Sequence, residues 1–282
     1  MEKETEGTLL AFLGMLLYGI EPVIIKANPV NPASFAAFSA AIASFILWPI
    51  ALSTSGWREL KENPQYLSKA ALVGIFGTGL AYAAYSHGAQ LSTAINASLI
   101  TRTEVLFSII LSCLVLRERV TGGQIFWSLL ILSGLGLVIT QGEMVTPRKG
   151  DLLLILVPLF WQIAHTIAKK LPYNPFLIAA LRNTFGAIFL LMLAIPQGLE
   201  FSEFAVIEAV ILSSGQVIWY LSIKRINLSK ATAIITPAPA VAIAVALILG
   251  EECTKYHAAG FVLILLGTLM VSRMESRMRE EL

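Results

Sequence analysis

The chain has 282 residues, of which 56% are apolar and only 13% are charged. Its mean hydropathy is +0.76, whereas a soluble domain carries about a quarter charged residues, so the composition excludes an ordinary soluble protein. The net charge of +2 gives no bulk attraction to nucleic acid, and we expect no such partner. We therefore predict an integral membrane protein.

The predicted elements begin with an apolar run that follows the polar residues 1–7. These residues lack the basic start and the cleavage site of a signal peptide, so the first run is expected to remain as a membrane span. A helix needs about 20 apolar residues to cross the hydrocarbon core, and runs of that length predict about ten spans. The runs cover approximately residues 8–27, 33–53, 67–89, 93–116, 123–141, 151–170, 175–196, 203–223, 229–249 and 257–273.

The connectors between these runs are short, and the longest, 54–66, is amphiphilic enough to lie at the membrane interface. Lysine and arginine in short loops favour the cytoplasmic side. With the N-terminus placed inside, the great majority of these residues fall in cytoplasmic connectors. We predict a multi-pass protein of the cell membrane with both termini in the cytoplasm.

The second half of the chain repeats features of the first. Each half holds five runs, and an odd number of spans forces the two copies to face opposite ways across the membrane. The predicted fold is therefore all-α, with ten transmembrane helices as two inverted five-helix repeats, 1–147 and 148–275, and a short cytoplasmic tail, 276–282. The matched positions are Tyr18 with Trp161, Pro32 with Pro175, Glu118 with Glu251, and Gly134 with Gly267.

The closing stretches of the two halves, 98–140 and 232–272, resemble the end of an EamA repeat: a span, a Glu at its end, and a Gly-containing span. Two such repeats make the ten-span fold of the drug/metabolite transporter (DMT) superfamily, so the resemblance implies a transporter. The family includes exporters of amino acids and other metabolites. The first repeat departs from the pattern, because Glu104 stands where the second repeat has Pro237 and Arg102 precedes it by two residues.

Ionisable residues inside the spans are costly and usually face a cavity or a partner. Arg102 and Glu104 are two apart on a predicted helix, so they should point nearly opposite ways and find other helices. Arg102 could meet Glu21 and Arg182 could meet Glu104, or the reverse. Such pairs could also be fixed struts between helices. The predicted substrate or transport cavity comprises Tyr18, Glu21, Asn96, Arg102, Thr103, Glu104, Trp161, His165 and Arg182.

Three prolines within spans are candidate hinges, namely Pro22, Pro237 and Pro239. A proline in a membrane helix frees a carbonyl, which is tolerated where a cavity or a neighbouring helix receives it. A bent packing helix is the alternative for each of them.

We predict that the protein is a secondary transporter that moves a small metabolite, either amino-acid-like or another small organic solute, by export or exchange through alternating access. Arg102 or Arg182 would meet an anionic group, Trp161 or Tyr18 would pack on the solute, and a glutamate would change protonation if protons are coupled. The expected partners are the solute, the lipid bilayer and, in that case, protons. The protein would act as a monomer or a homodimer.

No cofactor, metal site or catalytic residue is predicted. The glycine loop of ATP-binding proteins is absent from the sequence, and Cys113 and Cys253 have neither metal spacing nor a shared segment. One alternative is an intramembrane enzyme that uses Glu251, Glu252 and His257, although a solvated hairpin is the simpler interpretation of that connector. A passive channel is another alternative.

Overall fold

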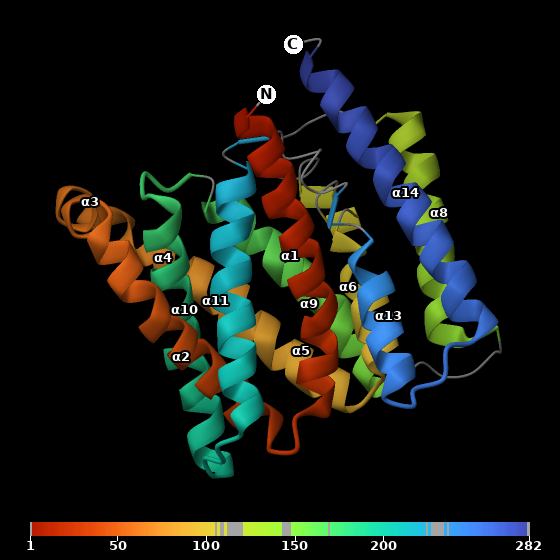
Figure 1. Cartoon of the computed structure of the whole chain (residues 1–282), viewed down its shortest axis with the longest axis horizontal. Coiled ribbons are helices and arrows are strands. Elements are labelled where there is room, and N and C mark those ends of the chain that lie inside the picture. The colour runs from red at the N-terminus through yellow and green to blue at the C-terminus, as the bar shows by residue number, and fades with distance from the viewer. Residues whose placement is uncertain are drawn as a thin grey trace.

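The computed structural model describes residues 2–104, 106–107, 110–111, 121–142, 148–168, 170–223, 225–226, 234–235 and 237–280, and it is all-helical over these ranges (Figure 1). The elements of the first half are α1 (Glu2–Ala27), α2 (Pro32–Ser53), α3 (Gly56–Glu62), η1 (Pro64–Tyr66), α4 (Leu67–Gly74), the π-helical η2 (Ile75–Leu80), α5 (Ala81–Gln90), α6 (Ala94–Thr101) and α8 (Gly122–Thr140). Those of the second half are α9 (Lys149–Ala168), α10 (Pro175–Ala194), η3 (Ile195–Gln197), α11 (Glu203–Ile223), α13 (Ala238–Ile248) and α14 (Lys255–Glu280).

Among the described residues, 7 helices or continuous helical runs are long and apolar enough to cross a membrane. The predicted third span is one such run, Pro64–Gln90, which joins η1, α4, η2 and α5. Two apolar segments are shorter, Ala238–Ile248 and Lys255–Val271. The predicted class, an all-helical multi-pass membrane protein, is confirmed.

Three predicted elements differ in their extent. The fourth run was expected to form one helix over 93–116, but α6 ends at Thr101, where Arg102 and Thr103 form a turn. The ninth was expected to be continuous over 229–249, but residues 234–235 are helical, Pro237 lies in a turn, and α13 begins at Ala238. The last helix, α14, continues to Glu280, so most of the predicted tail is helical. Cys113 and Glu118, singled out in the sequence, lie outside the described residues.

Local signals explain where the helices of both halves begin. The Asn31 side chain accepts from the Ala33 amide, 2.8 Å away, and caps α2, whose first residue is proline. Asn174 caps α10 in the same way, by accepting from the Leu177 amide at 2.9 Å. A cap of this kind satisfies an amide that has no partner within the helix. The same Asn-Pro start therefore sets the second helix of each half.

The corresponding helices of the two halves run antiparallel. The start of α2 meets the end of α10, where the Ser34 hydroxyl donates to the Gly198 carbonyl at 3.1 Å. At the opposite end, the Asn174 amide donates to the Ser55 hydroxyl at 3.3 Å. The end of α1 and the start of α9 likewise share one end of the molecule. As Figure 1 shows, α1 begins and α14 ends at the other end.

Candidate functional site

A pocket with a volume of about 80 Å³ lies inside the helical bundle, and both halves of the chain line it. Because one water needs roughly 10–15 Å³ on this measure, the pocket has room for on the order of five waters. α1, α5 and the segment after α6 contribute from the first half. α9, α10, α11 and Ile235 contribute from the second. The pocket is therefore set between the two repeated units.

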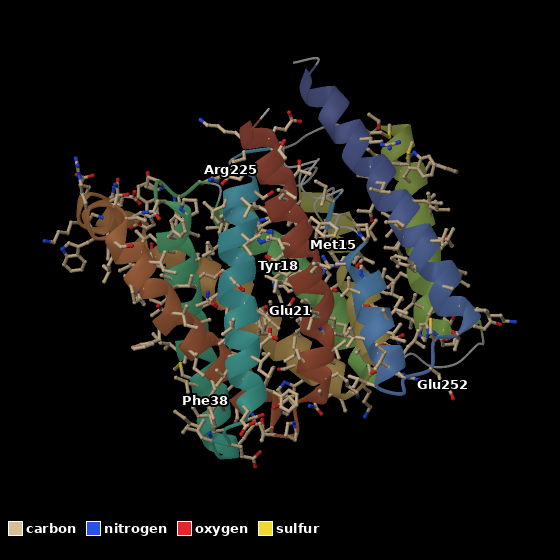
Figure 2. The ribbon with its side chains drawn as sticks, viewed as in Figure 1. Met15, Tyr18, Glu21, Phe38, Arg225 and Glu252 are labelled. Carbon is tan, nitrogen blue, oxygen red and sulfur yellow. The ribbon has the colours of Figure 1, made fainter. Side chains whose placement is uncertain are left out.

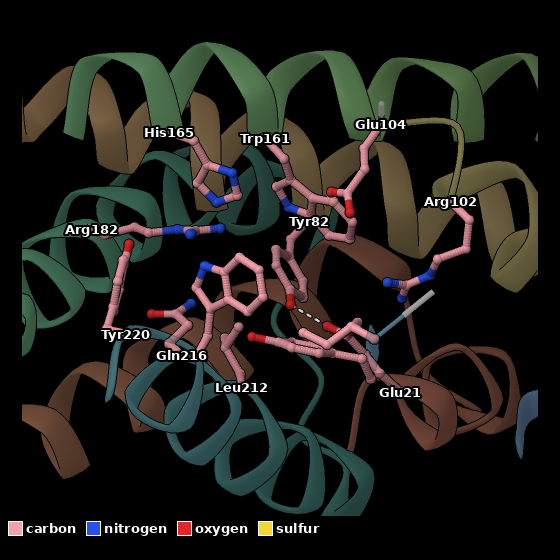
Figure 3. A pocket seen from close by; sticks show the side chains of 13 residues that line it. Glu21, Tyr82, Arg102, Glu104, Trp161, His165, Arg182, Leu212, Gln216 and Tyr220 are labelled. Atoms are coloured by element: carbon pink, nitrogen blue, oxygen red, sulfur yellow. Dashed lines mark hydrogen bonds between the residues drawn. The ribbon is translucent and has the colours of Figure 1, made fainter. Parts of the chain in front are cut away.

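Most of the side chains that the sequence suggested for a cavity line this pocket. Figure 3 shows Arg182, His165 and Tyr220 toward one end of the pocket and Arg102 and Glu21 toward the other. The predicted residues that it brings together are Tyr18, Glu21, Arg102, Glu104, Trp161, His165 and Arg182. The lining residues that the sequence analysis did not single out are Tyr82, Leu212, Gln216, Trp219, Tyr220 and Ile235.

Asn96 and Thr103, also predicted for the cavity, are not among the residues that line it. The Thr103 hydroxyl donates to the Ile100 carbonyl at 2.7 Å. Asn96 is buried near the start of α6, where its side chain bonds to Asp151 and His257. The prediction assumed one continuous helical face through both residues, but α6 ends between them, at Thr101.

The end of α6 also corrects the expected directions of Arg102 and Glu104. Two residues apart on an intact helix, they would point nearly opposite ways. Arg102 and Thr103 instead lie in a turn, in which their amides bond to carbonyls three residues back. Both Arg102 and Glu104 consequently line the same pocket (Figure 3). When the two halves are aligned, the break at Arg102 and Thr103 corresponds to the segment before α13. The fourth predicted span of each half is therefore interrupted.

Arg182 is buried, and neutral oxygen atoms hold it. Its Nη2 donates to the Gly77 carbonyl at 2.7 Å, and its Nε donates to the Thr78 hydroxyl at 3.2 Å. A Cβ at Gly77 would lie 2.9 Å from the Arg182 Nε, so glycine makes room for the guanidinium. The predicted direct pairing of Arg182 with a glutamate is not observed in the described part of the chain, where the ion pairs are Arg58–Glu62 and Arg225–Glu6. Its charge therefore stays available to a solute.

Several donors in the pocket lack a partner among the described residues. They include the Arg102 Nε, the Trp161 indole N–H and the Tyr220 hydroxyl, each of them buried. A buried donor without a partner costs roughly 1–3 kcal/mol. A solute with acceptor oxygens would satisfy these donors.

Within the same pocket, Tyr82 donates its hydroxyl to Glu21 (Figure 3). Glu21 projects from α1, which passes through the middle of the molecule (Figure 2). A further carboxyl group, Glu208 of α11, is fully buried beside Glu21. Glu208 was not singled out from the sequence, although it lies inside the predicted run 203–223. Counting about 1.5 Å per residue from Glu203 would have placed it well inside the span.

A hydrogen-bond network joins helices at the end of the bundle that lies opposite both termini. Asp151 accepts from Ser92 and, at 3.0 Å, from the Asn96 amide. His257 bonds to the Asn96 carbonyl oxygen at 2.9 Å, and Lys26 donates to the Ser92 carbonyl at 2.7 Å. α1, α6, α9 and α14 are thereby tied together at this end.

The connector before α14 was interpreted as a solvated hairpin, and that interpretation is wrong. The Glu251 carboxylate accepts from the amides of Ala94 and Ile95, at 2.9 and 3.2 Å, and so caps α6 from the other half of the chain. A carboxylate suits this place because a helix N-terminus carries partial positive charge. Glu252 is exposed at the same end (Figure 2).

Comparison with known proteins agrees with this architecture. A Bacillus subtilis protein named as the uncharacterized transporter YyaM is 24% identical over 86% of this chain and 85% of its own length. An uncharacterized transporter of Methanothermobacter thermautotrophicus is 23% identical over 81% of this chain and 74% of its own length. One solved crystal structure, titled only as that of a protein, shares the fold with a TM-score of 0.68 at 16% identity and covers 96% of this chain and 97% of its own.

The model of the EamA-like transporter family matches the chain twice, over residues 5–140 and 148–273. The resemblance stated from the sequence is confirmed, and the multiple apolar helices agree with a multi-pass protein of the cell membrane. This chain belongs to the EamA-like transporter family, within the drug/metabolite transporter superfamily.

Proposed function

We propose that this chain is a secondary transporter that moves a small organic solute by alternating access, for export or exchange. Its ten spans form two inverted five-helix repeats with both termini in the cytoplasm, and it acts as a monomer or a homodimer. The antiparallel packing of α2 against α10 supports the inversion. The distribution of lysine and arginine supports the orientation.

The observation that carries this proposal is one pocket lined by both repeats, next to a closed end of the bundle. Alternating access needs a site between two units that can move against each other. A pocket lined by both repeats suits that requirement. The hydrogen bonds of Asp151 and Asn96 suit a state in which the outer side is shut.

The charges of the pocket favour an anionic or zwitterionic solute. Arg182 and Arg102 would meet a carboxylate, because a guanidinium binds carboxylates through paired hydrogen bonds. Trp161 and Tyr18 would pack against the body of the solute. Glu104 would meet a cationic group or take up a proton. An amino-acid-like metabolite fits this set of groups.

Counterflow in proteoliposomes tests the proposal. Vesicles loaded with each of a panel of amino acids and other metabolites would be given the labelled solute outside, with and without a pH gradient. We expect saturable uptake of one solute class. Arg182→Gln should reduce uptake roughly tenfold or more, since a hydrogen bond to a charged group contributes about 1.5–3 kcal/mol and 1.4 kcal/mol is a factor of ten.

Arg58→Gln is the matched control, because Arg58 is exposed on α3 and pairs with Glu62. It should transport as the wild type does. Equal loss in both variants would show that Arg182 has no special part in binding. Uptake without counterflow or saturation would instead favour a passive channel.

An intramembrane enzyme built on Glu251, Glu252 and His257 is the other alternative. Glu251 and His257 bond to α6 and Asn96, which gives both a structural part. A solute recovered chemically changed from the vesicles would favour the enzyme, whereas recovery unchanged supports transport.

A further inference from the structure

α1 and α11 pack antiparallel with a register that brings two glutamates together. The Ser222 hydroxyl donates to the Gly7 carbonyl at 2.9 Å. Further along the pair, a Cβ at Gly215 would lie 3.2 Å from the Tyr18 ring. The same register carried one turn further sets Glu21 of α1 opposite the turn of α11 that contains Glu208. The two carboxyl groups are in contact there.

Both glutamates are shielded from solvent to a degree that is unusual for a charged side chain. Glu21 is 1% exposed and Glu208 is 0% exposed. Neither oxygen of Glu208 has a hydrogen-bond donor within the described residues. An ionised carboxylate with no donor and no solvent is strongly unfavourable. Two adjacent carboxylates in such a place cannot both keep a negative charge.

We propose that Glu21 and Glu208 form a proton-binding site in which the two carboxyl groups share one proton, and that this site couples a proton to the solute cycle of the proposed transporter. The shared proton is the donor that Glu208 otherwise lacks. Glu21 lines the pocket and Glu208 lies behind it. Protons therefore enter and leave through Glu21.

The groups around the pair stabilise the one negative charge that remains when a proton is shared. Tyr82 donates its hydroxyl to Glu21, and Tyr18 and Tyr85 stand nearby on α1 and α5. Arg102, after α6, and Arg182, on α10, are the cations that act on Glu21. With one proton bound, the pair carries a single negative charge facing two guanidinium groups. A solute carboxylate that occupies those guanidinium groups would favour loss of the charge, and hence proton uptake.

The proton step is balanced without a further reactant. On loading, an O–H bond forms between a proton from pocket water and a carboxylate oxygen of Glu21 or Glu208. On unloading, the same bond breaks and the proton returns to water on the other side.

Infrared spectroscopy of the full-length protein in lipid nanodiscs tests the site without any solute. We expect the carbonyl stretch of a protonated carboxyl group at neutral pH in sodium-free buffer, with a shift in heavy water. Glu208→Gln should remove this signal, because the amide of Gln donates to Glu21 and leaves it ionised. Glu252→Gln, at an exposed glutamate outside the pocket, is the matched control and should keep it.

Two results would overturn the proposal: a signal that survives Glu208→Gln, or a signal that disappears when sodium is added. Should Glu208→Gln fail to fold, Tyr82→Phe provides the second test. It removes the hydroxyl that donates to Glu21, so the signal should persist to a pH about one unit higher. No change, or a change in the other direction, would contradict a proton held by this pair.

A second arm uses the solute found by counterflow and keeps the two proposals distinguishable. Glu208→Gln should retain solute exchange but lose the dependence of uptake on the pH gradient. If the wild type moves no solute, the transporter proposal fails while the infrared result still decides the site. If the infrared signal is absent, the proton site fails while transport stands.

Discussion

Arg182 shows at the scale of one residue how a charge can be buried and still remain available. Its bonds go to the Gly77 carbonyl and the Thr78 hydroxyl, both in the π-helical η2. A π-helical turn widens the helix and leaves carbonyls tilted out of the usual ladder, and such turns are frequent at functional sites. η2 therefore holds the guanidinium in place without neutralising it.

Thr78→Val should destabilise the protein, because it removes the oxygen that accepts from the Arg182 Nε. We expect a loss of about 1.5 kcal/mol, which corresponds to a melting temperature lower by about 3–6 °C. Thermal unfolding in detergent measures it. Thr166→Val is the control, since the Thr166 hydroxyl donates to the Gln162 carbonyl one turn back. Equal shifts in the two variants would mean that Thr78 does not hold Arg182.

The sequence predicted individual residues unevenly, for a physical reason. Depth within an apolar run identified Glu21, Arg102 and Arg182, since a charge at membrane depth must face a cavity or a partner. Glu208 obeys the same rule, since it lies five residues inside the run 203–223, but it was not singled out. The direction of Glu104 could not be predicted, because it depends on a break in the helix that no proline marks in the first half.

At the scale of elements, α8 and α14 pack through close glycine contacts. A Cβ at Gly134 would lie 2.8 Å from the Gly260 carbonyl oxygen, closer than such atoms approach. Small residues let membrane helices approach to this distance. Gly136 lies two positions away on α8, and nothing is within 4 Å of a Cβ placed there. The two glycines therefore have different parts in the same helix.

Gly134→Ala should separate or distort the α8–α14 contact at a cost of about 1–3 kcal/mol, as expected for overpacking. Gly136→Ala should be neutral or slightly stabilising, because alanine favours a helix by up to about 1 kcal/mol over glycine. Thermal unfolding of both variants compares them directly. A lower melting temperature for Gly136→Ala than for Gly134→Ala would refute the close contact.

Hydropathy predicted the existence and order of the elements well, because the length of an apolar run is set by the membrane. It predicted poorly where a span is interrupted. Pro237, predicted as a hinge or a bend, directly precedes the start of α13, whereas no proline marks the end of α6 at Thr101. The docking of Glu251 on α6 is a contact between the two halves, which a single sequence does not reveal.

At the scale of the whole molecule, the network around Asp151 ties α6, α9 and α14 together at the end opposite both termini, which is the outer end in the proposed alternating-access cycle. A carrier must open that end, so these bonds should set how often the pocket faces outward. Asp151→Ala removes the acceptor of Ser92 and Asn96. Each bond to a charged group contributes about 1.5–3 kcal/mol, so we expect outward opening to become on the order of tenfold more frequent.

An impermeant thiol reagent applied outside right-side-out vesicles measures this opening. Leu212→Cys in a Cys253→Ser background places the thiol to be labelled in the pocket. The Cys253→Ser protein that keeps Leu212 gives the rate of labelling unrelated to the pocket. Asp151→Ala should accelerate labelling, whereas Glu252→Ala, exposed at the same end, should not. Unchanged labelling in Asp151→Ala would mean that this network does not control access.

The two interrupted helices also give the pocket an electrical direction. α6 ends and α13 begins at the level of the pocket, beside Arg102 and Ile235. A helix carries a partial negative charge at its end and a partial positive charge at its start. The pocket therefore meets one pole of each sign. A molecule with a positive group at one end and a negative group at the other would be aligned by this field before any side chain contacts it.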